Sequence, residues 1–357
     1  MRSSRSRLVL TGLVVAVLVA ACGGGGSTGP SASPVESAGP SASPVESGAP
    51  STARAKLTVG LGYIPSVQFA PFYLAQQNGW YAEAGFEVEF QNKIDPDLIT
   101  LVGQGAIDIG IGDGTSVIPA VSQGIPVRYV ATIYGKFPNV VFAKASSGIT
   151  KAADLKGKKI GTPGRYGSGW IMLQALLASA GLTTQDIEIV EYPDFTQRAA
   201  VEEGAVDAAT GFANNEPVQL ELNGEKAVIL RIDNITPLPG PGLISGVGTL
   251  ESKRAVIGAF VATTLRAMDE IAANPGTGLE AAIVAVPELA SARAAQLAIL
   301  QSTIELWNGP AQTANGRGAI DRDGWAKSID YLASLGLVPN PVTVDELVDD
   351  GLFRPGY

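Results

Sequence analysis

From residue 56 onward, short β-rich runs bounded by glycines alternate with stretches of helical length. Residues 57–63 and 86–90 have the composition of strands, and between them residues 71–78 form a helical stretch that ends before Gly79. Alternation of this kind is typical of parallel strands with helices on the faces of their sheet, because each helix returns the chain to the same edge. The pattern therefore predicts an α/β fold.

The same alternation continues to about residue 232. It predicts further strands at 108–111, 127–134, 158–161, 187–192, 207–211 and 227–232, and further helices at 95–104, 168–180, 195–203 and 216–223, with one more helix ending at Gln123. A second series begins near Val140, residues 243–249 can run back to the first series, and residues 251–335 are mostly helical. One continuous sheet would be unusually large, so we expect two α/β lobes. Residues 56–140 form the first part of lobe 1, residues 141–240 form lobe 2, and residues 241–357 return to lobe 1 and add the C-terminal helices.

Two residue types that carry much of enzyme chemistry are nearly missing. The 357 residues include no histidine and one cysteine, which excludes a Ser-His-Asp or Cys-His catalytic group, a His-ligated metal and a multi-cysteine cluster. With 34 acidic and 25 basic side chains the formal charge is −9, which argues against nucleic acid because phosphate binding needs a basic surface. We expect no catalytic residue, no metal, no cofactor and no nucleic-acid partner.

The N-terminus has the features of an export signal. Three arginines precede the apolar stretch Leu8–Ala20, whose 13 residues are fewer than the roughly 20 that a membrane-spanning helix needs. The sequence VAAC that ends at Cys22 resembles a bacterial lipobox, so residues 1–21 are expected to be a lipoprotein signal peptide and Cys22 the lipidated residue. The alternative is an ordinary signal peptide followed by an unmodified cysteine.

Residues 22–55 have a low-complexity composition. They contain a glycine run and the tandem decapeptides PSASPVESAG and PSASPVESGA. Such a segment buries too little apolar surface to fold, so we expect a flexible tether, the alternative being a cleaved or tolerated insert. The chain is then extracytoplasmic and lipid-anchored to the bacterial cell membrane.

Several motifs resemble one known family. They are YIPSVQFAPFYLA at 63–75, NGWY at 78–81, AGFEV at 84–88 and DLKGKKIG at 154–161. In these the chain resembles the solute-binding proteins of ABC importers, in the branch related to binders of thiamine pyrimidine precursors, alkanesulfonates and nitrate. The resemblance implies a periplasmic-binding-protein-like (type II) fold, two α/β lobes with a hinged ligand cleft, a monomeric protein and an ABC permease in the membrane as partner.

The candidate ligand site lies in four loops that follow strands, because ligands of open α/β sheets bind beyond the carboxyl ends of the strands. The loops are residues 63–69, 112–115, 162–168 and 214–217. Their aromatic rings suit a planar heterocycle, and their amides and carboxylates can hydrogen-bond its edge. The candidate ligand-binding residues are Tyr63, Gln68, Phe69, Asp113, Tyr134, Tyr166, Ser168, Asn214, Asn215 and Glu216.

The resemblance narrows the ligand but leaves alternatives. The pyrimidine binders have Trp at the place of Tyr63 and His at the place of Phe69, and a branch implicated in riboflavin uptake matches better. We therefore expect a planar vitamin or precursor, either riboflavin or a thiamine pyrimidine precursor. Residues 214–216 also fit a simple helix cap. A small oxyanion such as an alkanesulfonate or nitrate, bound near Arg165, is a second hypothesis. A pyrimidine-synthesising enzyme of the same fold is a third, which the absence of histidine disfavours.

Overall fold

The computed structural model describes residues 54–92, 97–233 and 235–352. Residues 52–357 make up one compact unit. The predicted signal peptide, Cys22 and the tether up to residue 53 lie outside the described residues, so these predictions stay open. Within the described ranges, every helix is too short or too polar to cross a membrane.

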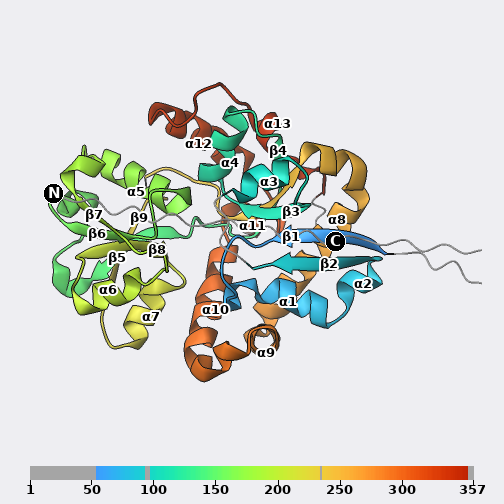
Figure 1. Cartoon of the computed structure of the whole chain (residues 1–357), viewed down its shortest axis with the longest axis horizontal. Coiled ribbons are helices and arrows are strands. Elements are labelled where there is room, and N and C mark those ends of the chain that lie inside the picture. Colours follow the sequence, from blue (N-terminus) through green and yellow to red (C-terminus); the bar gives the residue numbers. More distant parts are fainter. Residues whose placement is uncertain (1–53, 93–96, 234, 353–357) are drawn as a thin grey trace, which may run out of the picture. The chain divides into compact units, whose positions relative to one another are not determined.

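Two five-stranded sheets form the framework of this unit (Figure 1). The first has the order β2-β1-β3-β10-β4, with β1 at Ala55–Gly60, β2 at Phe86–Gln91, β3 at Ile109–Gly112, β4 at Val127–Thr132 and β10 at Gly242–Gly246. The second has the order β7-β6-β8-β5-β9, with β5 at Asn139–Lys144, β6 at Lys159–Thr162, β7 at Glu188–Glu191, β8 at Ala208–Phe212 and β9 at Ala227–Arg231. The fold is α/β, as predicted, and β10 returns the chain to the first sheet.

The expectation of purely parallel strands was wrong, because both sheets are mixed. In the first sheet β10 runs antiparallel to β3 and β4, and in the second β5 runs antiparallel to β8 and β9. Each of these strands is the one that the chain enters from the other sheet. Such a strand does not close a βαβ unit, so the rule that makes those units parallel does not apply to it.

The α-helices pack on both sheets. They are α1 Ala70–Gln77, α2 Trp80–Glu83, α3 Leu98–Gly103, α4 Gly114–Ser122, α5 Gly167–Ser179, α6 Gln197–Glu203, α7 Glu216–Leu222, α8 Val247–Ala273, α9 Pro275–Ala285, α10 Arg293–Trp307, α11 Pro310–Asn315, α12 Arg322–Ser334 and α13 Val344–Leu347. Short 3₁₀ turns lie at Val67–Phe69, Ala145–Ser147, Ala152–Leu155, Thr184–Asp186, Pro287–Ala292 and Asp350–Leu352. Figure 1 shows α5, α6 and α7 around the second sheet and α1, α3 and α8 around the first.

Aromatic stacking anchors the helices of the first sheet. The rings of Tyr81 and Phe260 lie parallel with centroids 5.2 Å apart, and Phe72 and Phe86 pack beside them. All four are at most 3% exposed, so they belong to the core. The sequence motif at 63–88 therefore supplies both core and cavity residues.

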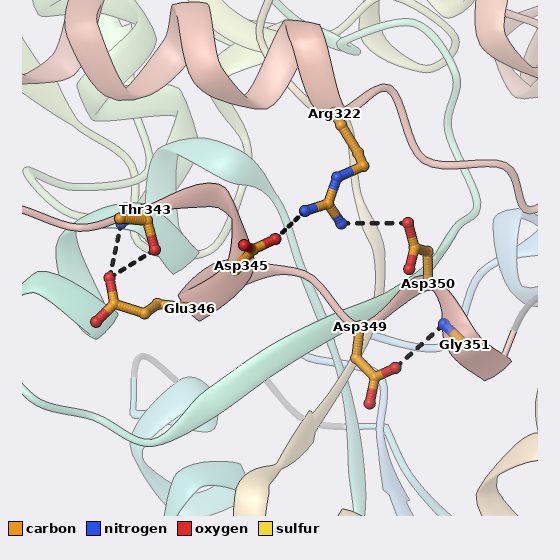
Figure 2. Close-up of polar contacts among 7 residues, drawn as sticks. All are labelled: Arg322, Thr343, Asp345, Glu346, Asp349, Asp350 and Gly351. Carbon is orange, nitrogen blue, oxygen red and sulfur yellow. Dashed lines mark hydrogen bonds and ion pairs between the residues drawn. The ribbon is translucent and has the colours of Figure 1, made fainter.

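The C-terminal segment fastens α12 to the first sheet. Arg322, at the start of α12, lies between Asp345 and Asp350, and Thr343 and Glu346 cap α13 (Figure 2). Ser328 of α12 in turn donates a hydrogen bond of 2.6 Å to the carbonyl of Pro237, in the segment that joins β9 to β10. The helix α12 therefore contacts both the C-terminal segment and one of the two connections between the sheets.

Candidate ligand-binding site

A cavity of about 330 Å³ lies among the loops that follow β1, β3, β6, β7 and β8. Both sheets contribute to its wall, and its volume is within the range of sites for multi-ring ligands. Nine of the ten predicted ligand residues line it. They are Tyr63, Gln68, Phe69, Asp113, Tyr134, Tyr166, Ser168, Asn215 and Glu216. The folding pattern thus brings together residues as far apart in the sequence as Tyr63 and Glu216.

Aromatic side chains from both sheets meet across this cavity. Tyr63, in the loop after β1, lies edge-on against Phe195, in the loop after β7, with centroids 5.2 Å apart and planes at 82°. Phe69 is buried, whereas Tyr166 is 44% exposed and its ring rests on Gly164, where a Cβ would lie 2.4 Å from Tyr166 Cε1. These rings give a planar ligand flat and edge-on surfaces to contact.

Asp113 is a buried carboxyl group in the cavity wall. It caps α4 by accepting hydrogen bonds from the Ser116 amide at 3.1 Å and the Thr115 hydroxyl at 2.6 Å. Burial raises the pKa of Asp113, while these donors and the Ser168 hydroxyl act in the opposite direction. Ser168 lies in the first turn of α5, beside the second sheet, so Asp113 and Ser168 line the cavity from different sheets.

Glu216 is the second buried carboxyl group of the cavity. It is the first residue of α7, and its side chain folds back over Gly211 to accept a hydrogen bond of 2.7 Å from the Phe212 amide. Burial raises the pKa of Glu216, and the positive charge of Arg198 and the nearby donors oppose this shift. The cap expected from Asn215 does not form through its side chain, which accepts a hydrogen bond from Gln219 instead.

Asn214, the tenth predicted residue, lies behind the cavity wall. It is fully buried, and its amide nitrogen donates to Gln68 Oε1 at 2.9 Å and to Thr303 Oγ1 at 2.7 Å. Gln68 Oε1 also accepts a hydrogen bond of 3.3 Å from the Tyr134 hydroxyl. Since Thr303 lies on α10, this network ties the loop after β8 to both the 63–69 loop and a C-terminal helix.

Sequence reasoning missed several lining residues. They include Phe72, Asn139, Thr162, Trp170, Phe195, Gln197, Thr210 and Phe212. Thr162 belonged to the predicted loop 162–168 but was not chosen, and Trp170 stood beside that loop. Phe195 and Gln197 were assigned to a helix at 195–203, whereas α6 begins at Gln197. The strand residues Thr210 and Asn139 carried no signal, because a polar residue inside a strand looks the same whether it faces a cavity or a helix.

The charge of the cavity distinguishes among ligands. Asp113 and Glu216 both line it, and among the described residues none of the lining side chains is Lys or Arg. Arg165, the residue considered for an oxyanion, pairs with Glu191 at 2.9 Å and lies 5.7 Å from the centre of the Trp170 ring. In the described part of the chain, moreover, no group of three or more carboxylate or cysteine side chains is placed to hold a metal ion. The geometry favours a ligand with hydrogen-bond donors and no negative charge.

Residues 66–277 match the family described as NMT1/THI5 like, and the chain belongs to this family. The riboflavin-binding protein RibY of Chloroflexus aurantiacus is 30% identical over 98% of each chain. A 4-amino-5-hydroxymethyl-2-methylpyrimidine phosphate synthase of Legionella pneumophila is 28% identical over 52% of this chain and 58% of its own. The alkanesulfonate-binding protein SsuA of Xanthomonas axonopodis, solved with bound MOPS, superposes with a TM-score of 0.62 at 18% identity over 83% of this chain and 98% of its own. The periplasmic-binding-protein-like fold that the motifs predicted is thereby confirmed.

Proposed function

We propose that this protein is the solute-binding component of an ABC importer and that it binds an uncharged planar heteroaromatic vitamin, riboflavin in the first place. The observation that carries the proposal is the cavity wall, which combines aromatic rings with two buried carboxyl groups and, among described residues, no lining cation. The full-length match to a riboflavin-binding protein supports it. A thiamine pyrimidine precursor is the smaller alternative.

In this proposal the ligand ring contacts the aromatic side chains, and its polar edge donates hydrogen bonds to the carboxyl groups. Tyr63 and Phe195 come from different sheets and contact one another, so they would hold the two lobes together beside the bound ligand. Closure of the two lobes would also remove the ligand from water, which strengthens each hydrogen bond. In this proposal the chain acts without a catalytic step, which fits its higher identity over nearly its whole length to a binding protein than to the synthase of Legionella pneumophila.

The remaining parts of the proposal concern where the protein works. Residues 1–21 would direct export, Cys22 would carry the lipid anchor, and residues 22–55 would tether a monomeric body to the outer side of the cell membrane. The ligand would then pass to a permease in the same membrane. Each of these points depends on residues outside the described ranges or on partners, and each remains a proposal.

The first experiment measures ligand binding by the purified full-length protein in mild detergent. Riboflavin at about a hundredfold excess over its Kd should raise the unfolding free energy by about 2.7 kcal/mol. Taurine and nitrate should leave the midpoint unchanged. Flavin mononucleotide should bind about tenfold more weakly or worse, because its phosphate meets the field of Asp113 and Glu216. Tighter binding of taurine or nitrate than of any heterocycle would overturn the proposal, and a shift by hydroxymethylpyrimidine alone would select the smaller ligand.

A pair of aromatic substitutions tests whether the cavity is the site. Tyr63→Leu should lower ligand affinity about tenfold, because it removes the ring that lies edge-on to Phe195. Trp80→Leu is the matched control, since Trp80 stacks with Arg266 at 3.8 Å and is not a cavity residue. Equal affinities of the two variants would exclude this cavity.

A further inference from the structure

The wall that the second sheet contributes carries a group of uncharged polar side chains. Asn139, Thr162, Ser168, Gln197 and Thr210 all line the cavity, and we refer to them as the hydroxyl–amide cluster. Four of the five are at most 3% exposed; Ser168 is half-buried. The wall from the first sheet is poorer in such groups and richer in apolar ones, such as Leu61, Phe69 and Ile133. The cavity therefore has an apolar side and a polar side.

Hydrogen bonds inside the cluster use up several of its protons. The Thr210 hydroxyl donates to Thr162 Oγ1 at 3.2 Å, and the Thr162 hydroxyl donates to the carbonyl of Gly164 at 3.0 Å. Gln197 Nε2 donates to the carbonyl of Thr210 at 3.3 Å. Asn139 Nδ2 donates to Ser168 Oγ at 3.1 Å. The cluster therefore offers a ligand mainly lone pairs.

One acceptor of the cluster has no protein partner. Gln197 Oε1 is buried, and no described residue donates a hydrogen bond to it. A buried carbonyl oxygen without a donor destabilises the fold, so such a group calls for a partner that the protein alone does not supply. Gln197 lines the cavity, so a ligand hydroxyl that reaches this side chain can supply the missing donor.

We propose that the hydroxyl–amide cluster is a subsite for the hydroxyl groups of a flexible chain attached to the ligand ring. Uncharged acceptors on Gln197, Thr162 and Thr210 suit hydroxyl donors, and one ligand hydroxyl can in return accept from the remaining N–H of Asn139. The apolar wall would hold the ring while the cluster holds its polyol substituent. This inference rests on the proposed function and adds to it the reason why the ligand is larger than a bare heterocycle.

Two flavins that differ only in the chain test this subsite. Riboflavin carries a hydroxylated ribityl chain, and lumiflavin carries a methyl group at the same nitrogen. The wild-type full-length protein should bind riboflavin about tenfold or more tightly than lumiflavin, because it makes at least one further hydrogen bond. Affinities are read from the quenching of flavin fluorescence on titration with protein.

Near-isosteric variants of the cluster give the second measurement. Thr210→Val and Gln197→Met should each lower riboflavin affinity about tenfold and change lumiflavin affinity less than about twofold. Thr264→Val is the control. Thr264 is buried and shares a hydrogen bond with Tyr81 outside the cavity, so this variant should change neither the riboflavin nor the lumiflavin affinity. Thermal midpoints of all variants test whether they are folded. The proposed subsite requires the same selective loss of riboflavin affinity in both cluster variants.

The outcomes separate the two proposals. Equal losses for both flavins, or no loss for either, would show that the cluster only supports the fold, and the subsite would be rejected while riboflavin binding stands. Equal binding of riboflavin and lumiflavin by the wild type would reject it as well. Failure of the wild type to bind any flavin would instead reject the proposed function, and with it this inference.

Discussion

Phe195 holds a left-handed backbone conformation with a φ of 61°, and it is the only non-glycine residue with a positive φ in the described part of the chain. A bulky side chain in this region costs on the order of 1–3 kcal/mol, and such residues cluster at binding sites. Here the conformation brings the ring against Tyr63, while the Phe195 amide donates to the carbonyl of Tyr192 at 3.0 Å. Local strain thus accompanies the contact between the two lobes.

Two substitutions at this residue separate the strain from the ring. Phe195→Gly removes both, and Phe195→Ala removes the ring but keeps a Cβ in the left-handed region. We expect Phe195→Gly to be more stable than Phe195→Ala by about 1 kcal/mol in denaturant unfolding, since only glycine adopts this backbone without cost. Both variants should bind ligand more weakly than the wild type. Equal stabilities would disprove the strain, and unchanged affinity would show that the ring is not a ligand contact.

At the scale of elements, the turn from β8 to α7 determines where a carboxyl group faces the cavity. The strand ends at Phe212, and α7 begins only four residues later at Glu216. This short turn folds the carboxylate back onto the Phe212 amide, over a glycine that has no side chain to block it. A Cβ on Gly211 would lie 2.7 Å from Glu216 Oε2 and 3.0 Å from Phe142 Cε1.

Gly211→Ala should therefore displace Glu216 from its position. We expect a loss of about 1–3 kcal/mol in unfolding free energy from overpacking, together with weaker ligand binding. Gly248→Ala serves as the control because nothing lies within 4 Å of the Cβ it would add, near the start of α8. Unfolding curves and flavin titrations of both variants provide the comparison. If Gly211→Ala retains wild-type affinity, the position of Glu216 does not matter for binding.

At the scale of the whole molecule, two kinds of carboxyl group respond to pH in opposite directions. Hydrogen bonds from Thr150, Thr183 and Thr343 each lower the pKa of an exposed carboxyl group that lies three or four residues further along the chain. Those groups stabilise the fold above their unfolded pKa values and lose the contribution as pH falls. Asp113 and Glu216 are buried with raised pKa values, so they behave in the reverse way.

The sign of the Glu216 effect gives a testable prediction. Its folded pKa is raised above the ordinary 4.5, so its favourable contribution is complete below pH 4.5 and is lost as pH rises through the folded pKa. Glu216→Gln, which keeps an acceptor for the Phe212 amide, removes this loss. The stability of Glu216→Gln relative to the ligand-free wild type should therefore grow from pH 4.5 to pH 7, as measured by thermal unfolding. A difference that does not change with pH would contradict a raised pKa.

The sequence by itself determined the order and approximate bounds of most strands and of most helices up to residue 223, and it located the loops that line the cavity. These properties depend on local periodicity, on glycines that end elements and on the rule that loops after strands meet at one edge. Nine of the ten residues chosen on this basis line the cavity. Those loops contain aromatic residues and no histidine. This composition also indicated a binder of planar molecules before any geometry was known.

Only the tertiary structure decided the direction of β5 and β10. It also placed Asn214 behind the cavity wall, and Phe195 and Gln197 in that wall. Each of these depends on contacts between segments far apart in the chain, which leave no period in the sequence. The two sheets also share one strand order, although the sequence shows no convincing repeat. Packing fixes which polar residues face the cavity, because a strand exposes alternate residues to opposite faces and the neighbouring helices decide which face is covered.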